Sequence, residues 1–326
     1  MKAVICHEFG PIESLVVEEV PDAVVRPRQV VVDVHACAAS FPDALIVQGL
    51  YQHKPPFPFS PGAELSGVIR EVGEGVTDLQ VGDRVIANTG YGSLAEQAAV
   101  PAHLCVKIPD TVDHIHASAF LSAYGTSYHG LFNRGQLKAG ETLLVLGAAG
   151  GVGLAAVELG VVHGATVIAA AGSDEKLDLC RRYGATSTIN YSTEDIKERV
   201  KELTNGKGAD VVYDAIGGQY SEPALRATAW GGRFLVVGFA AGYVPKVPLN
   251  LALLKGCSIV GVFWGAHVSA EPELHQANIA ELMRLWGDGQ LNPHVSAVYP
   301  LEQSVQAILD VANRKAMGRV VVTFDR

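Results

Sequence analysis

Residues 142–176 read TLLVLGAAGGVGLAAVELGVVHGATVIAAAGSDEK, and the fold expected for the chain follows from this run. Residues 143–146 are a short apolar run of the kind that a parallel strand needs, because both faces of such a strand are buried. A glycine-rich turn over 147–153 leads into apolar residues at helical spacing, and residues 166–170 form a second apolar run. The pattern predicts a βαβ unit of about the length that such a unit requires.

The turn of this unit carries a dinucleotide fingerprint, Ala148-x-Gly150-x-x-Gly153, with alanine in the first glycine position. We expect Gly150 to let the backbone approach a pyrophosphate and Gly153 to let the helix pack closely on the strand. The N–H groups of Gly151 and Val152 would face the anion at the positive end of the helix. A glycine-rich turn of some other α/β fold is the alternative, although strand, helix and second strand all fall where the fingerprint requires them.

Composition and charge exclude several classes of protein. The 326 residues are 48% hydrophobic and include 35 glycines, which is typical of an α/β enzyme with two domains. A net charge of −9 argues against nucleic acid or an anionic membrane as a partner. The five cysteines are scattered without C-x-x-C spacing, and neither a signal peptide nor an apolar run of membrane-spanning length is evident. We therefore expect a cytoplasmic protein with reduced thiols.

The remaining patterns divide the chain into two domains. Short β-like runs over residues 1–121 predict a twisted, partly closed antiparallel domain. Between 122 and 264, apolar strands alternate with helices, which predicts a doubly wound parallel sheet. Helical patterns and a last strand after Trp264 are expected to return to the first domain, so that residues 1–121 and 265–326 form one discontinuous unit. The six strands predicted for the parallel sheet are 143–146, 166–170, 187–189, 211–214, 234–237 and 259–262.

Motifs spread along the whole chain resemble the medium-chain dehydrogenase/reductase superfamily and occur in the family's order. The superfamily motifs are GAELSGVIREVGEGV at 62–76 and GDRV at 82–85. Those that narrow the resemblance to the zinc-independent quinone oxidoreductase branch are AAGGVG at 148–153, INY at 189–191, YDAIGG at 213–218, FPD at 41–43 and GLYQHKPP at 49–56. The resemblance, which extends to zeta-crystallin, implies a GroES-like β domain joined to a Rossmann domain.

The zinc ligands of the superfamily's alcohol dehydrogenases are replaced in this chain. Where those relatives have Cys, His and Cys, the resemblance places Ser40, Ala63 and Ser122. Hydroxyl and methyl groups are poor zinc ligands, and only Cys105 lies in the region of the structural zinc lobe. We therefore expect no metal, and we expect substrates with an intrinsic electron sink, such as quinones and enones, for which the nicotinamide supplies the difficult chemistry.

The expected cofactor is NADPH. The resemblance places Ser173, Lys176 and Tyr191 around the adenosine 2′-phosphate. Ala171 and Gly172 occupy the place where an NAD enzyme usually keeps an acidic residue for the ribose hydroxyls. A solvated helix-surface lysine is the alternative for Lys176, and a half-buried tyrosine at a strand end is the alternative for Tyr191.

Four further residues are candidates for the nicotinamide end of the cofactor. The resemblance places Thr126 near the nicotinamide amide, with a plain helix-start threonine as the alternative. Phe239, Phe263 and Trp264 follow the fifth and sixth predicted strands at their carboxyl ends, where doubly wound folds bind ligands. Core packing is the competing interpretation for these three rings.

The candidate catalytic residues are Ser40, Asp43 and Tyr51, on the segment that lines the nicotinamide side in relatives. The resemblance implies a hydrogen-bonding role for Ser40, although some quinone reductases of the family have Asn at this place. Asp43 would orient a water or a ribose hydroxyl, or form a loop-stabilising Asx-turn. Tyr51 would donate a hydrogen bond to a carbonyl oxygen, or pack. We expect Glu64 to be a buried structural acid.

Three functions remain open from the sequence. The first is NADPH-dependent hydride transfer to a quinone or activated enone, and the second is reduction of a 2-enoyl thioester such as an enoyl-CoA. The third is a non-catalytic NADPH-binding protein of the crystallin type. For each we expect a homodimer formed by edge pairing of residues 258–262, because that run has no charge or proline to guard a free edge and relatives commonly dimerise this way.

Overall fold

The structure, a computed structural model, describes residues 1–325, which fall into two compact units. The first unit comprises Met1–Ser122 together with the residues from Pro293 onward, and the second comprises Ala123–Asn292. The first unit is thus discontinuous in sequence, and the chain passes between the units twice.

The second unit extends further along the chain than the boundary after Trp264 that the sequence predicts. It includes α9 (Trp264–Ala270) and α10 (Pro272–Gly287), which we had expected in the other domain. A Cβ on Gly125 would lie 2.8 Å from the indole of Trp264, and Asn278 Nδ2 donates to Asn133 Oδ1 at 2.7 Å. These contacts attach both helices to the second unit, whereas an amphipathic pattern does not reveal which sheet a helix covers.

The core of the second unit is a six-stranded parallel sheet in the order β10-β9-β8-β11-β12-β13. This confirms the doubly wound sheet predicted from the sequence. β8 lies at its centre, and its residues after Thr142 are fully buried because both faces are covered. The strands are β8 (Thr142–Leu146), β9 (Thr166–Ala171), β10 (Ser187–Asn190), β11 (Ala209–Asp214), β12 (Thr228–Val236) and β13 (Ser258–Gly261).

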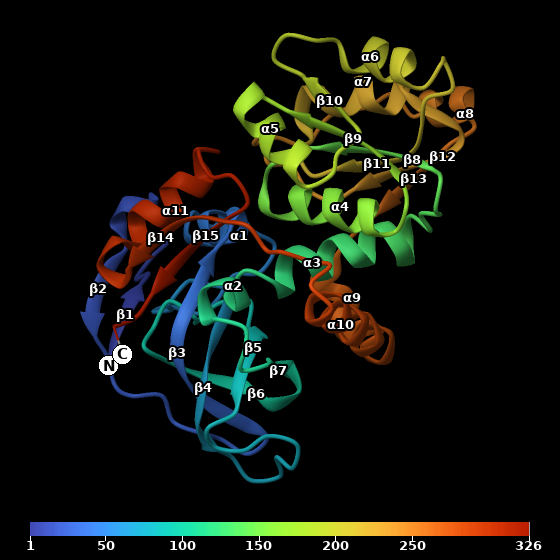
Figure 1. Ribbon diagram of the computed structural model, residues 1–326. Coiled ribbons are helices and arrows are strands. Elements are labelled where there is room, and N and C mark those ends of the chain that lie inside the picture. The colour runs from blue at the N-terminus through green and yellow to red at the C-terminus, as the bar shows by residue number, and fades with distance from the viewer. Residues whose placement is uncertain (326) are drawn as a thin grey trace. The chain divides into compact units, whose positions relative to one another are not determined.

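Helices cover both faces of this sheet. In Figure 1, α4 (Gly151–Val162) lies along one face, while α6 (Ile196–Leu203) and α7 (Ser221–Arg226) lie on the other. Buried on the sheet, α4 is apolar all round except for a single charged residue, Glu158. The other helices of the unit are α5 (Asp174–Arg182) and α8 (Asn250–Lys255), with the short η4 (Gly218–Tyr220) and the π-helical η3 (His129–Arg134).

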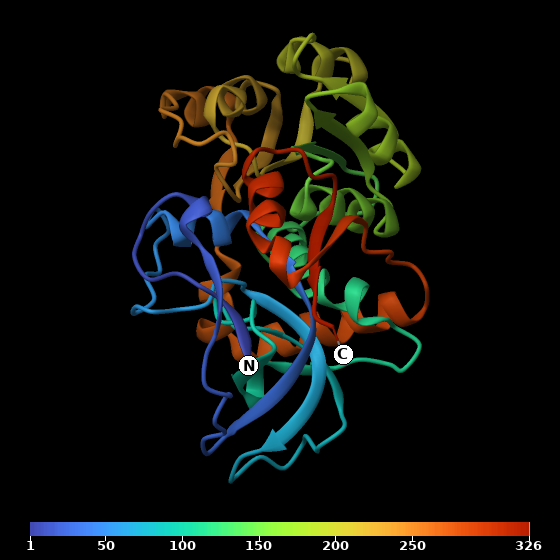
Figure 2. The same ribbon diagram turned by 90° about the vertical axis from the view of Figure 1, so that its left-hand side faces the viewer.

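The first unit is built around the long strand β3 (Gln29–Ala39). It pairs antiparallel with β4 (Glu64–Val72), β6 (Gln97–Pro101) and the C-terminal β15 (Arg319–Thr323). Figure 2 shows β3 and β4 as long bent ribbons, with the red C-terminal strand beside blue β3. The other strands are β14 (Val295–Pro300), β5 (Arg84–Asn88), β7 (Cys105–Lys107) and the separate pair β1 (Lys2–Ile5) and β2 (Val16–Glu19).

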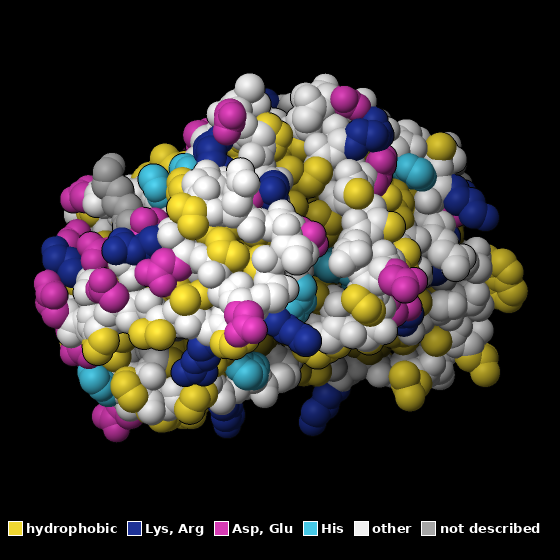
Figure 3. All heavy atoms as spheres, turned by 90° about the horizontal axis from the view of Figure 1, so that it is seen from below, with side chains coloured by type: hydrophobic (Ala, Val, Ile, Leu, Met, Phe, Trp, Pro, Cys, Tyr) yellow, Lys and Arg dark blue, Asp and Glu magenta, His cyan; other side chains and the backbone are white. Residues whose placement is uncertain are grey.

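The helices of the first unit are short. They are α1 (Phe41–Val47), α2 (His114–Ser118) and α11 (Ser304–Ala312), while α3 (Leu121–Tyr128) begins in this unit and continues into the second. No helix among residues 1–325 has the length and apolarity needed to cross a membrane. On the face in Figure 3, acidic and basic side chains are interspersed, without one large patch of a single sign.

Candidate functional site

The predicted dinucleotide turn forms at the carboxyl end of β8. Gly150 is the N-cap of α4, which begins at Gly151 and has no acidic residue in its first turn. The first N–H groups of a helix have no partner within the helix, and at this end of the dipole they favour an anion. The backbone N–H groups of Gly151 and Val152 therefore lie at a helix end that favours an anion such as a pyrophosphate.

Gly153 is required by the close approach of α4 to the turn. A Cβ there would lie 2.1 Å from the carbonyl oxygen of Gly147, a contact that no side chain can relieve. At Gly150, in contrast, a Cβ would lie 3.3 Å from the same oxygen, which is tight but not prohibitive. Packing therefore explains Gly153 but not Gly150, for which space for a ligand stays the prediction of the fingerprint. Ala148 is fully buried behind the turn.

The carboxyl end of β9 carries no acidic side chain, because Ala171 and Gly172 occupy it. Gly172 follows the strand, and a Cβ on it would lie 3.2 Å from Tyr191 Cε2 and 3.7 Å from the Tyr191 hydroxyl. Ser192 Oγ donates to the Gly172 carbonyl at 2.9 Å. The structure thus brings Gly172 and the Tyr191 hydroxyl together, and neither Ala171 nor Gly172 at this strand end carries an acidic side chain.

The next helix, α5, begins directly after Gly172, with Ser173 as its N-cap. Ser173 Oγ accepts from the Lys176 N–H at 3.5 Å, so that Lys176 lies in the first turn with a half-buried side chain. The neighbouring acid, Asp174, accepts from Asn190 Nδ2 at 2.9 Å. That hydrogen bond holds the Asp174 carboxylate beside Asn190, the last residue of β10, which directly precedes Tyr191. Ser173 and Lys176 thus lie at the start of α5 and Tyr191 lies directly after β10, and their role toward a 2′-phosphate stays a prediction.

One aromatic residue beside Tyr191, Tyr220, was not among the candidates predicted from the sequence. The ring of Tyr220, in η4, lies 4.3 Å from the ring of Tyr191, with 41° between their planes. Such a contact restricts the Tyr191 ring and hence the position of its hydroxyl. A sequence signal existed, since Tyr220 closely follows the Tyr213-to-Gly218 motif at the carboxyl end of β11.

The residues proposed for the nicotinamide end occupy different environments. Thr126 is half-buried on α3, next to Ser127, whose Oγ donates to the Val152 carbonyl at 2.7 Å. Thr126 thus lies close to the first turn of α4. Phe239 contacts Gly217 after β11, since a Cβ on Gly217 would lie 2.8 Å from the Phe239 ring.

The two residues that follow β13 differ from each other in exposure. Trp264 is buried against Gly125, while the side chain of Phe263 is 58% exposed. The contact of Trp264 with Gly125 is the core packing that we considered as the alternative for this residue. Because Gly125 directly precedes Thr126, this contact also supports the segment that presents Thr126.

In the first unit, Ser40 and Asp43 interact with each other. They form a capping box at the start of α1, in which Asp43 Oδ2 accepts from Ser40 N at 2.7 Å and from Ser40 Oγ at 2.5 Å. Asp43 Oδ1 accepts from Gly62 N at 3.1 Å. Burial raises the pKa of Asp43, and the hydrogen bonds from Ser40 oppose that rise. The pattern Ser-x-x-Asp is a readable signal for this local role.

Tyr51 differs from these two residues because its hydroxyl has no partner. Its ring packs against the core of the first unit, and the hydroxyl makes no hydrogen bond to the part of the chain that the structure describes. Burial and, to a smaller degree, the Asp43 carboxylate raise the pKa of Tyr51. The hydroxyl therefore stays protonated at neutral pH and can act as a donor.

Glu64 is a buried structural acid, as expected from the sequence. Its Oε2 accepts from Arg319 Nη2 at 2.7 Å, and its Oε1 accepts from Ser122 N at 3.0 Å. Burial raises the pKa of Glu64 to about 7, and the charge of Arg319 opposes the rise. Among residues 1–325, no three His, Cys, Asp or Glu side chains are grouped so that they could hold a metal ion.

Two family profiles match the chain. Residues 26–110 match the alcohol dehydrogenase GroES-like domain, and residues 151–283 match the family described as zinc-binding dehydrogenase. These ranges fall on the antiparallel sheet of the first unit and on the parallel sheet of the second. The family description includes zinc, while the positions discussed above hold Ser40, Ala63 and Ser122.

Individual relatives agree with the profiles. The quinone oxidoreductase-like protein 2 homolog of Nematostella vectensis is 42% identical over 98% of this chain and 88% of its own length. The Escherichia coli quinone oxidoreductase, solved in complex with NADPH, is 28% identical and superposes with a TM-score of 0.92 over 99% of this chain and all of its own. The CurK enoyl reductase is 26% identical, with a TM-score of 0.91 over 99% of each chain.

These similarities extend over nearly the whole chain and include both units. They agree with the motifs quoted above and with the GroES-like and Rossmann architecture observed here. The chain belongs to the quinone oxidoreductase-like protein 2 family of the medium-chain dehydrogenase/reductase superfamily.

Proposed function

We propose that this protein transfers hydride from NADPH to a quinone or an activated enone without the help of a metal. The observation that carries the cofactor choice is the end of β9, where Ala171 and Gly172 supply no acidic side chain and a Cβ on Gly172 would lie 3.7 Å from the Tyr191 hydroxyl. The likeness to a quinone oxidoreductase that was solved with NADPH supports the same cofactor.

The residues present fit NADPH along the carboxyl edge of the parallel sheet. The N–H groups of Gly151 and Val152 would hold the pyrophosphate, and Gly150 gives the space for its approach. The 2′-phosphate would take hydrogen bonds from Ser173 and Tyr191 and charge from Lys176. Thr126 would donate to or accept from the nicotinamide amide, and Phe239 would bound that end of the pocket.

Toward the quinone or enone, the residues of this chain would hold the acceptor in place and supply one hydrogen-bond donor. The nicotinamide, when bound, supplies a hydride, that is, one proton together with two electrons. A quinone or enone accepts it at carbon or oxygen and stores the charge on a conjugated oxygen. The free Tyr51 hydroxyl would donate a hydrogen bond to that oxygen, which solvent then protonates. The Ser40 hydroxyl donates to Asp43, so Ser40 acts through α1 and not as a donor to substrate.

The test is a substrate panel with both nicotinamide cofactors. The purified protein is incubated with NADPH or NADH and with small quinones such as 9,10-phenanthrenequinone, with enones and with enoyl-CoA esters. We expect oxidation of NADPH by quinones or enones, unchanged after dialysis against EDTA, and far less than one zinc per chain in untagged protein. A stoichiometric zinc that is needed for activity would contradict the proposal.

The second candidate is reduction of a 2-enoyl thioester. The full-length likeness to the CurK enoyl reductase favours it, and the chemistry differs only in the group that activates the double bond. Turnover of enoyl-CoA esters alone would select this function. Tight binding of NADPH without turnover of any acceptor would instead support the non-catalytic, crystallin-like alternative.

A further inference from the structure

The chain enters and leaves the second unit through two connections, residues 122–124 and 292–294. Both connections are hydrogen-bonded to one carboxylate, that of Glu158. The chain enters this unit at Ala123 and leaves it after Asn292. Tyr124, one residue inside the entry, donates through its hydroxyl to Glu158 Oε2 at 2.6 Å. Asn292, the last residue before the exit, donates through its backbone N–H to Glu158 Oε1 at 2.9 Å. Each carboxylate oxygen thus holds one connection.

The exit is held from a second side as well. The Tyr183 hydroxyl, which follows α5, donates to the carbonyl oxygen of Asn292 at 2.8 Å. The N–H and the C=O of Asn292 are therefore both engaged within the second unit. Hydrogen-bonded backbone amides exchange slowly with solvent. The backbone of Asn292 therefore has a fixed position at the point where the chain leaves the second unit.

This cluster is enclosed. Glu158 is 8% exposed and Tyr124 is 3% exposed. Burial raises the pKa of Glu158, while the hydrogen bonds from Tyr124 and Asn292 oppose that rise. A buried acid costs free energy unless its acceptors are used, and here both oxygens have donors. An apolar residue would satisfy the packing of α4, so packing alone does not explain an acid at this position.

The position of Glu158 connects this cluster to the nucleotide turn. Glu158 lies on α4 seven residues after Gly151, which corresponds to about 10 Å along a helix. A second hydrogen bond joins the same two helices closer to the turn, because Ser127 Oγ on α3 donates to the Val152 carbonyl at 2.7 Å. A rigid helix therefore links the proposed pyrophosphate site to both connections.

We propose that Glu158 is a positioning residue that fixes both connections of the second unit to the nucleotide-binding helix. This rests on the proposed function, in which NADPH binds at the first turn of α4. Binding of NADPH to the first turn of α4 then restrains the entry and the exit through Glu158. The expected result is that the nucleotide lowers the mobility of residues 122–124 and 292–294.

Two variants of Glu158 separate its hydrogen bonds from its charge. Glu158→Gln keeps an oxygen that accepts from Asn292 N–H and offers an amide to the Tyr124 oxygen, so we expect it to retain the coupling. Glu158→Leu fills similar volume and loses both bonds. Val157→Ala, a buried residue of the same helix with no polar contact, is the control for a general loss of stability.

The experiment is hydrogen exchange of the full-length protein with and without NADPH, together with single-turnover hydride transfer. In wild type and Glu158→Gln, we expect NADPH to slow exchange at residues 122–124 and 292–294. In Glu158→Leu, the nucleotide still binds and protects the turn at 150–153, but the protection of both connections is lost. Hydride transfer at saturating NADPH falls about ten-fold or more, because small misplacements of reactants are costly.

The control fixes the interpretation. Val157→Ala should lower the melting temperature as much as Glu158→Leu while keeping the protection of both connections and the rate of hydride transfer. If Glu158→Leu keeps the NADPH-dependent protection, the inference is overturned whatever the activity. If no acceptor is reduced by wild type, the proposed function fails, and the exchange experiment still decides the role of Glu158.

Discussion

Arg319 Nη2 donates to Glu64 Oε2 at 2.7 Å across 255 residues of sequence, and the side chains are 8% and 1% exposed. Arg319 begins β15 and Glu64 begins β4, the two strands that flank β3. The ion pair therefore joins the early and late parts of the first unit through two buried side chains. A charge buried in this way is costly when its partner is removed.

The two partners of this pair should differ in the cost of their removal. Glu64→Leu leaves a buried guanidinium that cannot lose its proton, and we expect a loss of about 3–5 kcal/mol in the free energy of unfolding. Arg319→Leu should cost less, since Glu64 can take up a proton. The double variant should recover most of the loss, as measured by urea unfolding. Equal costs for the single variants would contradict this assignment.

The stability of the protein should also depend on pH through Glu64. Its pKa in the folded protein is about 7, raised by burial above the usual value near 4.5. The folded state therefore binds this proton more tightly than the unfolded state. Its contribution to stability is fully present below about pH 4.5 and is lost as the pH rises toward and through 7. Urea unfolding of wild type and Glu64→Gln at several pH values should show that only wild type has this component.

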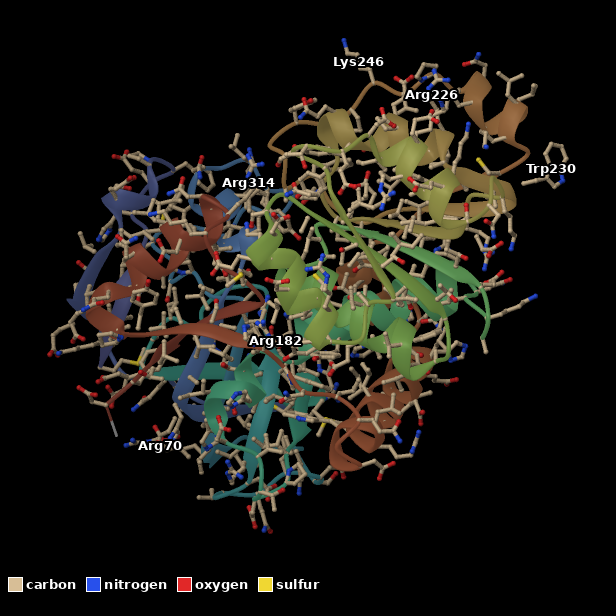
Figure 4. The ribbon with its side chains drawn as sticks, turned by 45° about the horizontal axis from the view of Figure 1, so that its top comes forward. Arg70, Arg182, Arg226, Trp230, Lys246 and Arg314 are labelled. Atoms are coloured by element: carbon tan, nitrogen blue, oxygen red, sulfur yellow. The ribbon has the colours of Figure 1, made fainter. Side chains whose placement is uncertain are left out.

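Lys176 should decide between the two nicotinamide cofactors. A charge-assisted hydrogen bond contributes roughly 1.5–3 kcal/mol, which corresponds to about one to two decades in affinity. We therefore expect Lys176→Ala to weaken NADPH binding about ten-fold or more and to leave NADH binding nearly unchanged, as measured by fluorescence titration. Arg182→Ala, at the exposed far end of α5 in Figure 4, is the control for loss of surface charge. If Lys176→Ala weakened NADPH and NADH binding equally, Lys176 would not contact the 2′-phosphate.

Tyr51 should matter for the rate of reduction and not for cofactor binding. Its hydroxyl is the donor that we assign to the acceptor oxygen, so Tyr51→Phe should lower kcat with a quinone about ten-fold or more. The dissociation constant for NADPH should stay unchanged, because no cofactor contact is assigned to Tyr51. An unchanged kcat would show that Tyr51 only packs against the core of the first unit.

The free edge of β13 should form the interface of a homodimer. β13 pairs only with β12 among the described strands, and Ile259 on it is 40% exposed. The same unit exposes Trp230, which projects outward in Figure 4 and lies against Gly256, the residue that ends α8. Light scattering at micromolar concentration should give a dimer, and Ile259→Lys should shift it toward monomer. Val81→Lys, an exposed valine of the first unit, is the control, and a monomeric wild type would contradict the prediction.

Much of the parallel sheet could be predicted because its strands are continuous apolar runs. The predicted run 143–146 corresponds to β8, and 166–170 corresponds to β9, each within one residue of the observed ends. Errors were larger where a strand carries polar or glycine residues. Thus β12 begins at Thr228, well before the predicted 234, because Trp230-Gly231-Gly232 resembles a turn.

The site was predictable where a motif has a local geometry and less so where contacts are distant. The turn at 148–153 depends on glycines within or next to it, so the local sequence is enough to predict its conformation. The hydrogen bonds of Glu158 depend on Tyr124 and Asn292, which are far away in sequence. A local signal was nevertheless present, since Glu158 is the one charge in an apolar helix. For the ring contact between Tyr191 and Tyr220, the signal was only that Tyr220 closely follows the motif at 213–218.

The pairing of β15 with β3 has a consequence for how the chain folds during synthesis. Residues 123–292 are contiguous and contain all six strands of their sheet, so they can fold while the ribosome is still extending the chain. β3 was made much earlier, and its residues 36–39 gain β15 as a neighbour only when residues 319–323 emerge. Until then, this short segment of β3 has an unpaired edge, while residues 29–33 already have β6 as a partner.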